Sequence, residues 1–277
     1  MSGVLLAALS NFFLEISDSI GKYEVKRGAV SFYTFGFLSV FFGTVILVAQ
    51  GFVRNDLVFS LASLPTFLPR IALEILQAHV MARAITISDR GDFGFVRTLT
   101  IPILLIIDIF LGYTIGIQQI LGMILILSSV LVLVFIERGH IRGKAYLLIG
   151  TVNAALTISL YKYDISHFNS VAAEQGLVSI AIMAYFFVLA RYSAGENPFR
   201  YLRRRVFFAQ SFVSGLAGVA SSFAYTFAPA SVITAGLRSS AVLFAMLSGK
   251  IYFRERHFFA KAILFVLVIT GFLLLIP

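Results

Sequence analysis

Ten apolar runs, each long enough to cross a lipid bilayer, follow one another along this chain of 277 residues. A membrane-spanning helix needs about 20 mostly apolar residues, and every backbone polar group inside a bilayer must be paired within the protein. The runs cover residues 3–21, 29–50, 61–84, 93–112, 117–136, 144–162, 168–190, 206–227, 229–250 and 258–276. The connections between them are short, so the sequence predicts an all-α integral membrane protein with ten transmembrane helices and no soluble domain.

The composition excludes a soluble globular protein. Hydrophobic residues make up 59% of the chain and charged residues 13%, whereas about 25% of the residues in a soluble domain are charged. Cysteine is absent from the sequence, which excludes a disulfide framework, a thiolate nucleophile and a cysteine-ligated metal site.

The net charge of +9 would suit a nucleic-acid partner, but the basic residues gather in and beside the connections that follow the odd-numbered runs. Such residues stay on the cytoplasmic side of a membrane, where they face anionic lipid headgroups. We therefore expect membrane lipids, and no nucleic acid, to be the partners of this charge. An even number of spans then places both termini on the outer side.

The first and sixth runs share a sequence pattern. Residues 11–17 and residues 153–159 both read N-x-x-L-x-I-S, and each copy is followed by a Lys-Tyr-acid triplet, at 22–24 and 162–164. A repeat of this kind has to be recognised before single motifs are interpreted, because it decides the architecture.

The repeat divides the chain into two halves of five spans, residues 1–138 and 139–277. Because five is odd, the second half must enter the membrane in the opposite sense to the first. Inverted-topology repeats recur in secondary transporters, in which the substrate site lies near the midplane between the repeats and the two repeats rock against each other.

The second half carries the more diagnostic motifs. It contains SFAYTFAPAS at 222–231, a helix ending at Gly249 and FRER at 253–256, and the first half matches more loosely, with Gly112 closing its fourth span. These features resemble the EamA repeat of the drug/metabolite transporter superfamily. The resemblance implies a ten-helix exporter or exchanger of small metabolites in the cell's inner membrane. It also implies that both termini are cytoplasmic, whereas the charge distribution predicts that they lie outside.

Several polar and ionisable residues fall inside the predicted spans. A charge at the bilayer centre costs at least about 2.5 kcal/mol, so it normally faces a partner or a watery cavity. We expect the first, third, sixth, seventh and ninth spans to line a polar cavity, and the fifth and tenth to face lipid or a second copy of the chain in a homodimer. The candidate substrate-binding residues are Asn11, Glu15, Arg70, Glu74, Asn153, Thr157, Tyr161, Glu174 and Arg238.

Arg238 is the strongest of these candidates. Its own helix carries no acidic residue one turn away, so its partner must come from another span or from the substrate. Its planar guanidinium would bind an anionic substrate group, or it would pair with Glu15, Glu74 or Glu174. Glu15 and Glu74 are the candidates for proton coupling, since burial can bring a carboxylate into the range where it loads and releases protons. Arg70 and Glu74 are also spaced to pair within one helix.

The predicted function is transport of a small polar solute by alternating access. The chain lacks the common catalytic motifs, so we expect no catalytic residues, no cofactor and no metal site. The alternative is a membrane protein that handles a lipid or lipid-linked substrate, as a flippase or a membrane enzyme.

Overall fold

The structure, a computed structural model, describes residues 2–110, 116–136, 141–228 and 230–275. Within these ranges the chain is helical and contains no strand. The elements are α1 (Ser2–Lys26), α2 (Phe32–Val53), η1 (Leu61–Ser63), α3 (Leu64–Ile87), α4 (Arg90–Arg97), α5 (Thr100–Phe110), α6 (Ile117–Ile136), α7 (Lys144–His167), α8 (Val171–Ser193), α9 (Pro198–Tyr201), α10 (Arg205–Ala224), α11 (Ala230–Ile251) and α12 (Phe258–Leu275). The predicted boundary at 138/139 and Gly112 lie outside the described residues.

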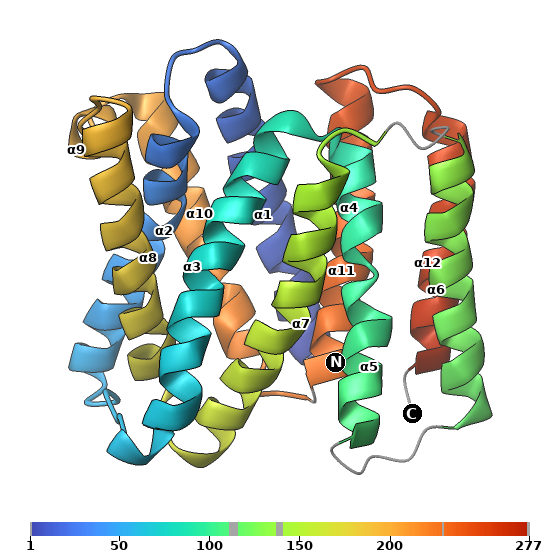
Figure 1. Ribbon diagram of the computed structural model, residues 1–277, viewed down its shortest axis with the longest axis horizontal. Helices are drawn as coiled ribbons and strands as arrows, with labels where there is room; N and C mark the ends of the chain where they lie inside the picture. Colours follow the sequence, from blue (N-terminus) through green and yellow to red (C-terminus); the bar gives the residue numbers. More distant parts are fainter. Residues whose placement is uncertain (1, 111–115, 137–140, 229, 276–277) are drawn as a thin grey trace.

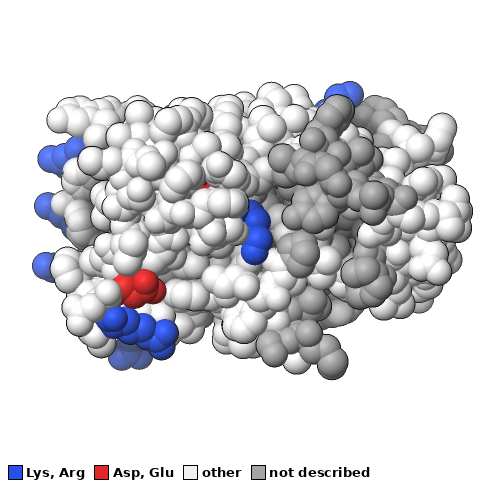
Figure 2. Space-filling view, turned by 90° about the horizontal axis from the view of Figure 1, so that it is seen from below, with Lys and Arg blue, Asp and Glu red and all other residues white. Residues whose placement is uncertain are grey.

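Five helices, α2, α6, α8, α10 and α11, are long and apolar enough to cross a membrane. Large apolar side chains also point outward, such as Phe135 and Phe259, as the hydrocarbon core requires of the surface that faces it. Seen from below, the molecule is mostly uncharged, with small groups of basic and acidic residues (Figure 2). These features are compatible with a multi-pass membrane protein.

The helices form one bundle in which distant segments lie side by side (Figure 1). At one end of the long axis α2 packs against α8, and at the other end α6 packs against α12. Between them α1 packs against α10 and α11, while α7 packs against α3, α4 and α5. Both chain termini lie toward the lower end in this view.

The ends of the helices follow from local sequence. Ser31 and Ser170 precede α2 and α8, and their hydroxyls accept hydrogen bonds from the N–H groups of Thr34 and Ala173, both at 3.2 Å. These caps satisfy N–H groups that have no partner within the helix. Gly143 starts α7 with a φ of 70°, a left-handed conformation that glycine adopts without strain.

The fourth predicted span differs from the prediction. A single helix was expected over 93–112, but α4 begins earlier, at Arg90, and the helix breaks between Arg97 and Thr100. Pro102 explains the break: it has no N–H for the carbonyl of Thr98, which instead accepts from Ile101 at 2.9 Å in a tighter turn. The earlier start places Arg90 in a helix instead of a connection.

The helix α4 is buried and packs closely against α11. Gly94 permits the approach, since a Cβ there would lie 3.2 Å from the Cα of Val242 and 3.3 Å from the Cβ of Ala245. Arg90 and Arg97, seven residues apart, lie on one side of α4.

Candidate functional site

One buried ion cluster joins α1, α4 and α11. The guanidinium of Arg90 binds Glu15 through two hydrogen bonds, Nε to Oε1 at 2.9 Å and Nη2 to Oε2 at 2.6 Å. Nη2 also lies 3.1 Å from Oδ2 of Asp18, and the hydroxyl of Ser248 donates to Glu15. We call Glu15, Asp18, Arg90 and Ser248 the Arg90 cluster. Two parallel N–H···O bonds to one carboxylate are among the strongest and most directional of ion pairs.

The start of α4 is held by residues from the C-terminal part of the chain. Glu255, in the connection after α11, accepts hydrogen bonds from the backbone N–H groups of Arg90 and Gly91, the latter at 2.9 Å. A carboxylate there satisfies free N–H groups and complements the positive end of the helix. Lys261 of α12 lies 2.7 Å from Asp92 and 3.6 Å from Glu255.

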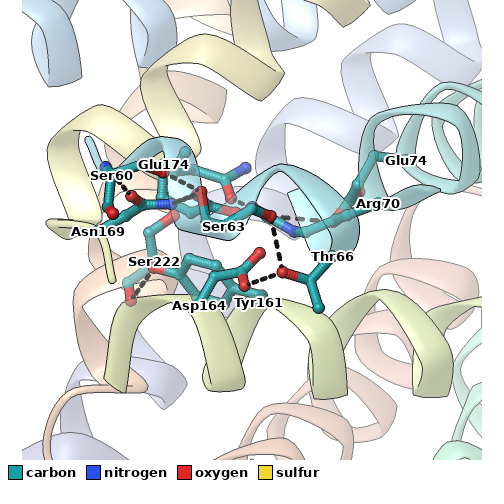
Figure 3. Close-up of polar contacts among 11 residues, drawn as sticks. Ser60, Ser63, Thr66, Arg70, Glu74, Tyr161, Asp164, Asn169, Glu174 and Ser222 are labelled. Atoms are coloured by element: carbon teal, nitrogen blue, oxygen red, sulfur yellow. Dashed lines mark hydrogen bonds and ion pairs between the residues drawn. The ribbon is translucent and has the colours of Figure 1, made fainter. Parts of the chain in front are cut away.

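A second buried ion cluster joins α3 and α8 (Figure 3). Arg70 pairs with Glu174, donates to Gln175 at 2.6 Å, and lies 3.4 Å from Glu74 on its own helix. Its guanidinium lies over the ring of Tyr161, 4.6 Å from the centroid. We call Arg70, Glu74, Glu174 and Gln175 the Arg70 cluster.

Further hydrogen bonds extend this cluster to α7 and α10 (Figure 3). Asn169 donates to Glu174 at 2.6 Å and to Ser63 at 3.0 Å. Tyr161 donates to the carbonyl of Ser222 at 2.9 Å, and Thr66 donates to Asp164 at 2.5 Å. The Arg70 cluster is thus near the lower end of the bundle in Figure 1, where α3 begins, and the Arg90 cluster is in the upper half, where α4 begins.

A small cavity of about 10 Å³ adjoins the Arg90 cluster. Its volume is about that of one water molecule. It is lined by Asn11, Leu14, Glu15, Asp18, Arg90, Phe93, Gly94, Arg97, Ala241 and Ala245. The space at this level is therefore lined by charged side chains and too small for more than a water molecule.

Two arginines at this level have no carboxylate partner. Neither Arg97 nor Arg238 forms an ion pair or a side-chain hydrogen bond with any residue that the structure describes, and Arg238 is only 7% exposed with its Nε unpaired. Arg97 lies over the ring of Phe93, 5.0 Å from the centroid. Glu255 follows α11 and binds the start of α4, and Gly94 meets Val242, so the two helices run antiparallel. Arg97, three residues after Gly94, and Arg238, four residues before Val242, therefore lie at the same level of this contact.

A larger groove, of about 750 Å³, runs along the outward face of α1 beside α10 and α11. Its lining is mostly apolar and includes Phe12, Ile16, Tyr23, Phe244 and Leu247. Glu15 and Ser248 also reach this groove, and Glu15 lines the small cavity as well. One carboxylate is therefore accessible from both spaces.

The predicted site residues fall into two groups. In the first group, the predicted pairing of Arg70 with Glu74 is confirmed, and Glu174 and Tyr161 also contact Arg70. In the second group, Glu15 pairs with Arg90. Arg238 pairs with none of the three carboxylates proposed for it, Glu15, Glu74 and Glu174.

Two of the uncharged candidates connect neighbouring helices, and a third forms a hydrogen bond within its own helix. Asn11 holds α1 to α11 through the carbonyl of Leu237 and through Ser240 at 3.0 Å. Asn153 holds α7 to α3 through the carbonyl of Leu73 at 2.8 Å. Thr157 donates to a carbonyl of its own helix at 3.2 Å.

Sequence reasoning missed Arg90 and Arg97. The fourth apolar run begins at residue 93, which leaves Arg90 in a connection, and no sequence pattern distinguishes Arg97 within that run. The signal that could have found them is their seven-residue spacing in RGDFGFVR: in a helix that begins at Arg90, both side chains lie on one face.

A scan against models of protein families gives no match to this chain, and a search of curated proteins finds no similar sequence. The site is therefore interpreted from its own geometry.

Proposed function

We propose that this chain is a secondary transporter of a small polar solute, built from two inverted five-helix halves and working by alternating access. The ten spans, the inner cell membrane and the membership of the EamA group of the drug/metabolite transporter superfamily are parts of this proposal. The observation that carries it is a contact that occurs once in each half of the chain.

The contact is made by the lysine of each Lys-Tyr-acid triplet. Lys22 donates to the carbonyl of Ser88 at 2.5 Å, and Lys162 donates to the carbonyl of Tyr225 at 2.7 Å. Ser88 ends α3 and Tyr225 ends α10, and each is followed by the fourth helix of its half. Corresponding lysines thus hold corresponding helix ends, which supports a common fold for the two halves.

The packing of the helices supports the same arrangement. The first helix of one half, α1, packs against the third and fourth helices of the other half, α10 and α11. The first helix of the second half, α7, packs in return against α3 and the broken helix α4–α5. A two-fold axis in the membrane plane that relates the two halves would produce this reciprocal packing.

The ion clusters would then act as closures at the two ends of the pathway. Arg70 and Glu174 belong to different halves, and so do Arg90 and the carboxylate of Glu255 that binds its backbone N–H. Rocking of one half against the other would open one of these contacts while keeping the other. The cavity beside the Arg90 cluster has room for about one water molecule, which fits a state in which the pathway is not open at that level.

The absence of native cysteine allows a direct test of alternating access. In the connections at the lower end, the backbone N–H of Ser170 donates to the carbonyl of Val58 at 2.9 Å, across the two halves. We expect Val58→Cys/Ser170→Cys, reconstituted in liposomes loaded with a metabolite extract, to exchange solutes when reduced and to stop when oxidised. The two single-cysteine variants are the controls, and wild-type liposomes that exchange no solute would refute the proposal.

The second candidate is the handling of a lipid or lipid-linked substrate, and the large apolar groove beside α1 favours it. A volume of about 750 Å³ is within the range of small-molecule sites, and several of its apolar side chains face outward toward the bilayer. Movement of a labelled lipid between leaflets, with no solute exchange in the same liposomes, would favour this candidate.

The outward faces of α6 and α12 belong to the same proposal. Both helices lie at one end of the bundle (Figure 1), with exposed apolar side chains such as Ile124, Phe135 and Phe259. In the membrane these faces would contact lipid or the second copy of a homodimer.

A further inference from the structure

We propose that Arg97 and Arg238 together bind the anionic group of the transported solute, a carboxylate or a phosphate, so that the substrate is an anion. This inference rests on the proposed transport function and adds the substrate class and a residue, Arg97, that the sequence did not indicate.

The first step is the balance of charge around the small cavity. The lining of the cavity contains two carboxylates, those of Glu15 and Asp18, and two guanidinium groups, those of Arg90 and Arg97. Arg238 lies on the face of α11 that carries the lining residues Ala241 and Ala245, three and seven residues further along the helix. Arg90 engages both carboxylates. Arg97 and Arg238 form no ion pair with any residue that the structure describes. The charged side chains of the lining sum to zero, and Arg238 beside them adds one positive charge.

The second step is the cost of leaving these arginines unpaired. An arginine side chain stays charged in proteins, and burying it without a partner, as for Arg238, is strongly unfavourable. Arg97 is partly exposed. Glu15 and Asp18, the two carboxylates that line the cavity, are already engaged by Arg90. A bound anion would supply the charge that the chain itself does not.

The third step is the position of the two side chains. Ala241, three residues after Arg238, lines the cavity, and Asn11 holds this part of α11 against α1 through the carbonyl of Leu237. Arg97 lines the cavity directly, at the end of α4 where the helix breaks. One flat face of its guanidinium lies on Phe93, which leaves the N–H groups at its edge to bind oxygen atoms.

The present cavity is too small for a solute. With room for one water molecule, it must widen between α1, α4 and α11 before an anion can enter. Rocking of the two halves would provide this change, because α11 belongs to the second half and α1 and α4 to the first.

The test compares matched variants in the same liposome exchange assay. The variants are Arg97→Gln, Arg238→Gln, Arg238→Lys and, as a control, Arg203→Gln, which removes an exposed arginine far from the site in sequence. We expect the solutes exchanged by the wild type to be carboxylates or phosphates. Exchange should fall at least tenfold in both glutamine variants, recover in part in Arg238→Lys and stay unchanged in Arg203→Gln.

Each other outcome has a defined meaning. Exchange confined to neutral or cationic solutes, or anion exchange unchanged in both glutamine variants, would overturn the inference and leave the transport proposal standing. Movement of an anionic lipid that both glutamine variants abolish would keep the anion site and identify its source as a lipid headgroup.

If no solute or lipid moves in any sample, the transport proposal fails, and a binding measurement decides the inference by itself. The purified wild type would be heated in detergent with sodium phosphate or sodium citrate replacing sodium chloride at equal ionic strength. A rise in unfolding temperature that Arg97→Gln and Arg238→Gln both lose would retain the anion site. The same temperature in all three salts would overturn it.

Discussion

The Arg70 and Arg90 clusters resemble each other in construction. Each has a central arginine that is 1% exposed, binds two carboxylates and lies over an aromatic ring. Each also draws its residues from helices that are distant in sequence. In both clusters the buried charges are paired, as the low dielectric of the interior demands.

The surroundings of the two clusters differ. Glu174 of the Arg70 cluster also accepts a hydrogen bond from Asn169, and Arg70 also donates to Gln175, although Nε of Arg70 has no partner among the described residues. The Arg90 cluster adjoins a cavity and two arginines without carboxylates. Similar ion pairs therefore have different surroundings: the Arg70 cluster is extended by hydrogen bonds to neighbouring side chains, and the Arg90 cluster borders a small cavity.

The largest expected effect is on the coupling of solute flux to protons. Each cluster contains one candidate for the coupling carboxylate, Glu15 in the Arg90 cluster and Glu74 in the Arg70 cluster. We expect Glu15→Gln to abolish flux driven by a pH gradient and to reduce exchange without a gradient far less, because Glu15 alone reaches both the cavity and the groove. Solute uptake by liposomes with and without the gradient measures this. Loss of pH dependence in Glu74→Gln alone would move the coupling site to the Arg70 cluster.

The next effect is on stability. Arg70→Gln should lower the free energy of unfolding by about 3 to 5 kcal/mol, because it leaves the fully buried Glu174 without its guanidinium. Denaturant unfolding in detergent measures the loss. In the double variant Arg70→Gln/Glu174→Gln part of the stability should return, since the unpaired charge is gone; a double variant no more stable than the single one would contradict the pairing.

Arg90→Gln should destabilise the protein by a smaller amount, about 2 to 3 kcal/mol. Glu15 is slightly more exposed than Glu174 and keeps a hydrogen bond from Ser248. Denaturant unfolding of Arg90→Gln in detergent measures this loss of stability. A loss larger than that of Arg70→Gln would reverse the predicted order of the two clusters.

Arg238→Gln should have the smallest effect on stability and the opposite sign. Removing a buried charge that has no partner relieves its cost of desolvation, so the free energy of unfolding should stay equal or rise by up to about 1 kcal/mol. A loss similar to that of Arg90→Gln would mean that Arg238 contributes to folding, and would weaken the contrast drawn between the two regions.

Much of the fold could be predicted from the order of residues alone. The apolar runs correspond to the helices of the structure to within a few residues at most ends, since in an apolar environment a long apolar segment pairs its backbone groups best as a helix. The fourth span is the exception, because one proline in its middle breaks the helix and hydropathy does not detect this.

The candidate site could be predicted only in part. The i, i+4 spacing of Arg70 and Glu74 is a local property of one helix, and the predicted pair is present at 3.4 Å. The pairing of Arg90 with Glu15 joins residues 75 positions apart, and no pattern along either helix specifies which neighbour a polar side chain will meet.

The sequence by itself determined an apolar helical chain, the repeated motif and the residues that bring charge into the interior, because hydropathy and helical period are properties of consecutive residues. Only the tertiary structure decided how those charges are distributed. Packing of α4 against α1 and α11 assigns Glu15 and Asp18 to Arg90. The physical reason is that a buried carboxylate pairs with the guanidinium that packing brings nearest, and this leaves Arg97 and Arg238 without an ion pair among the described residues.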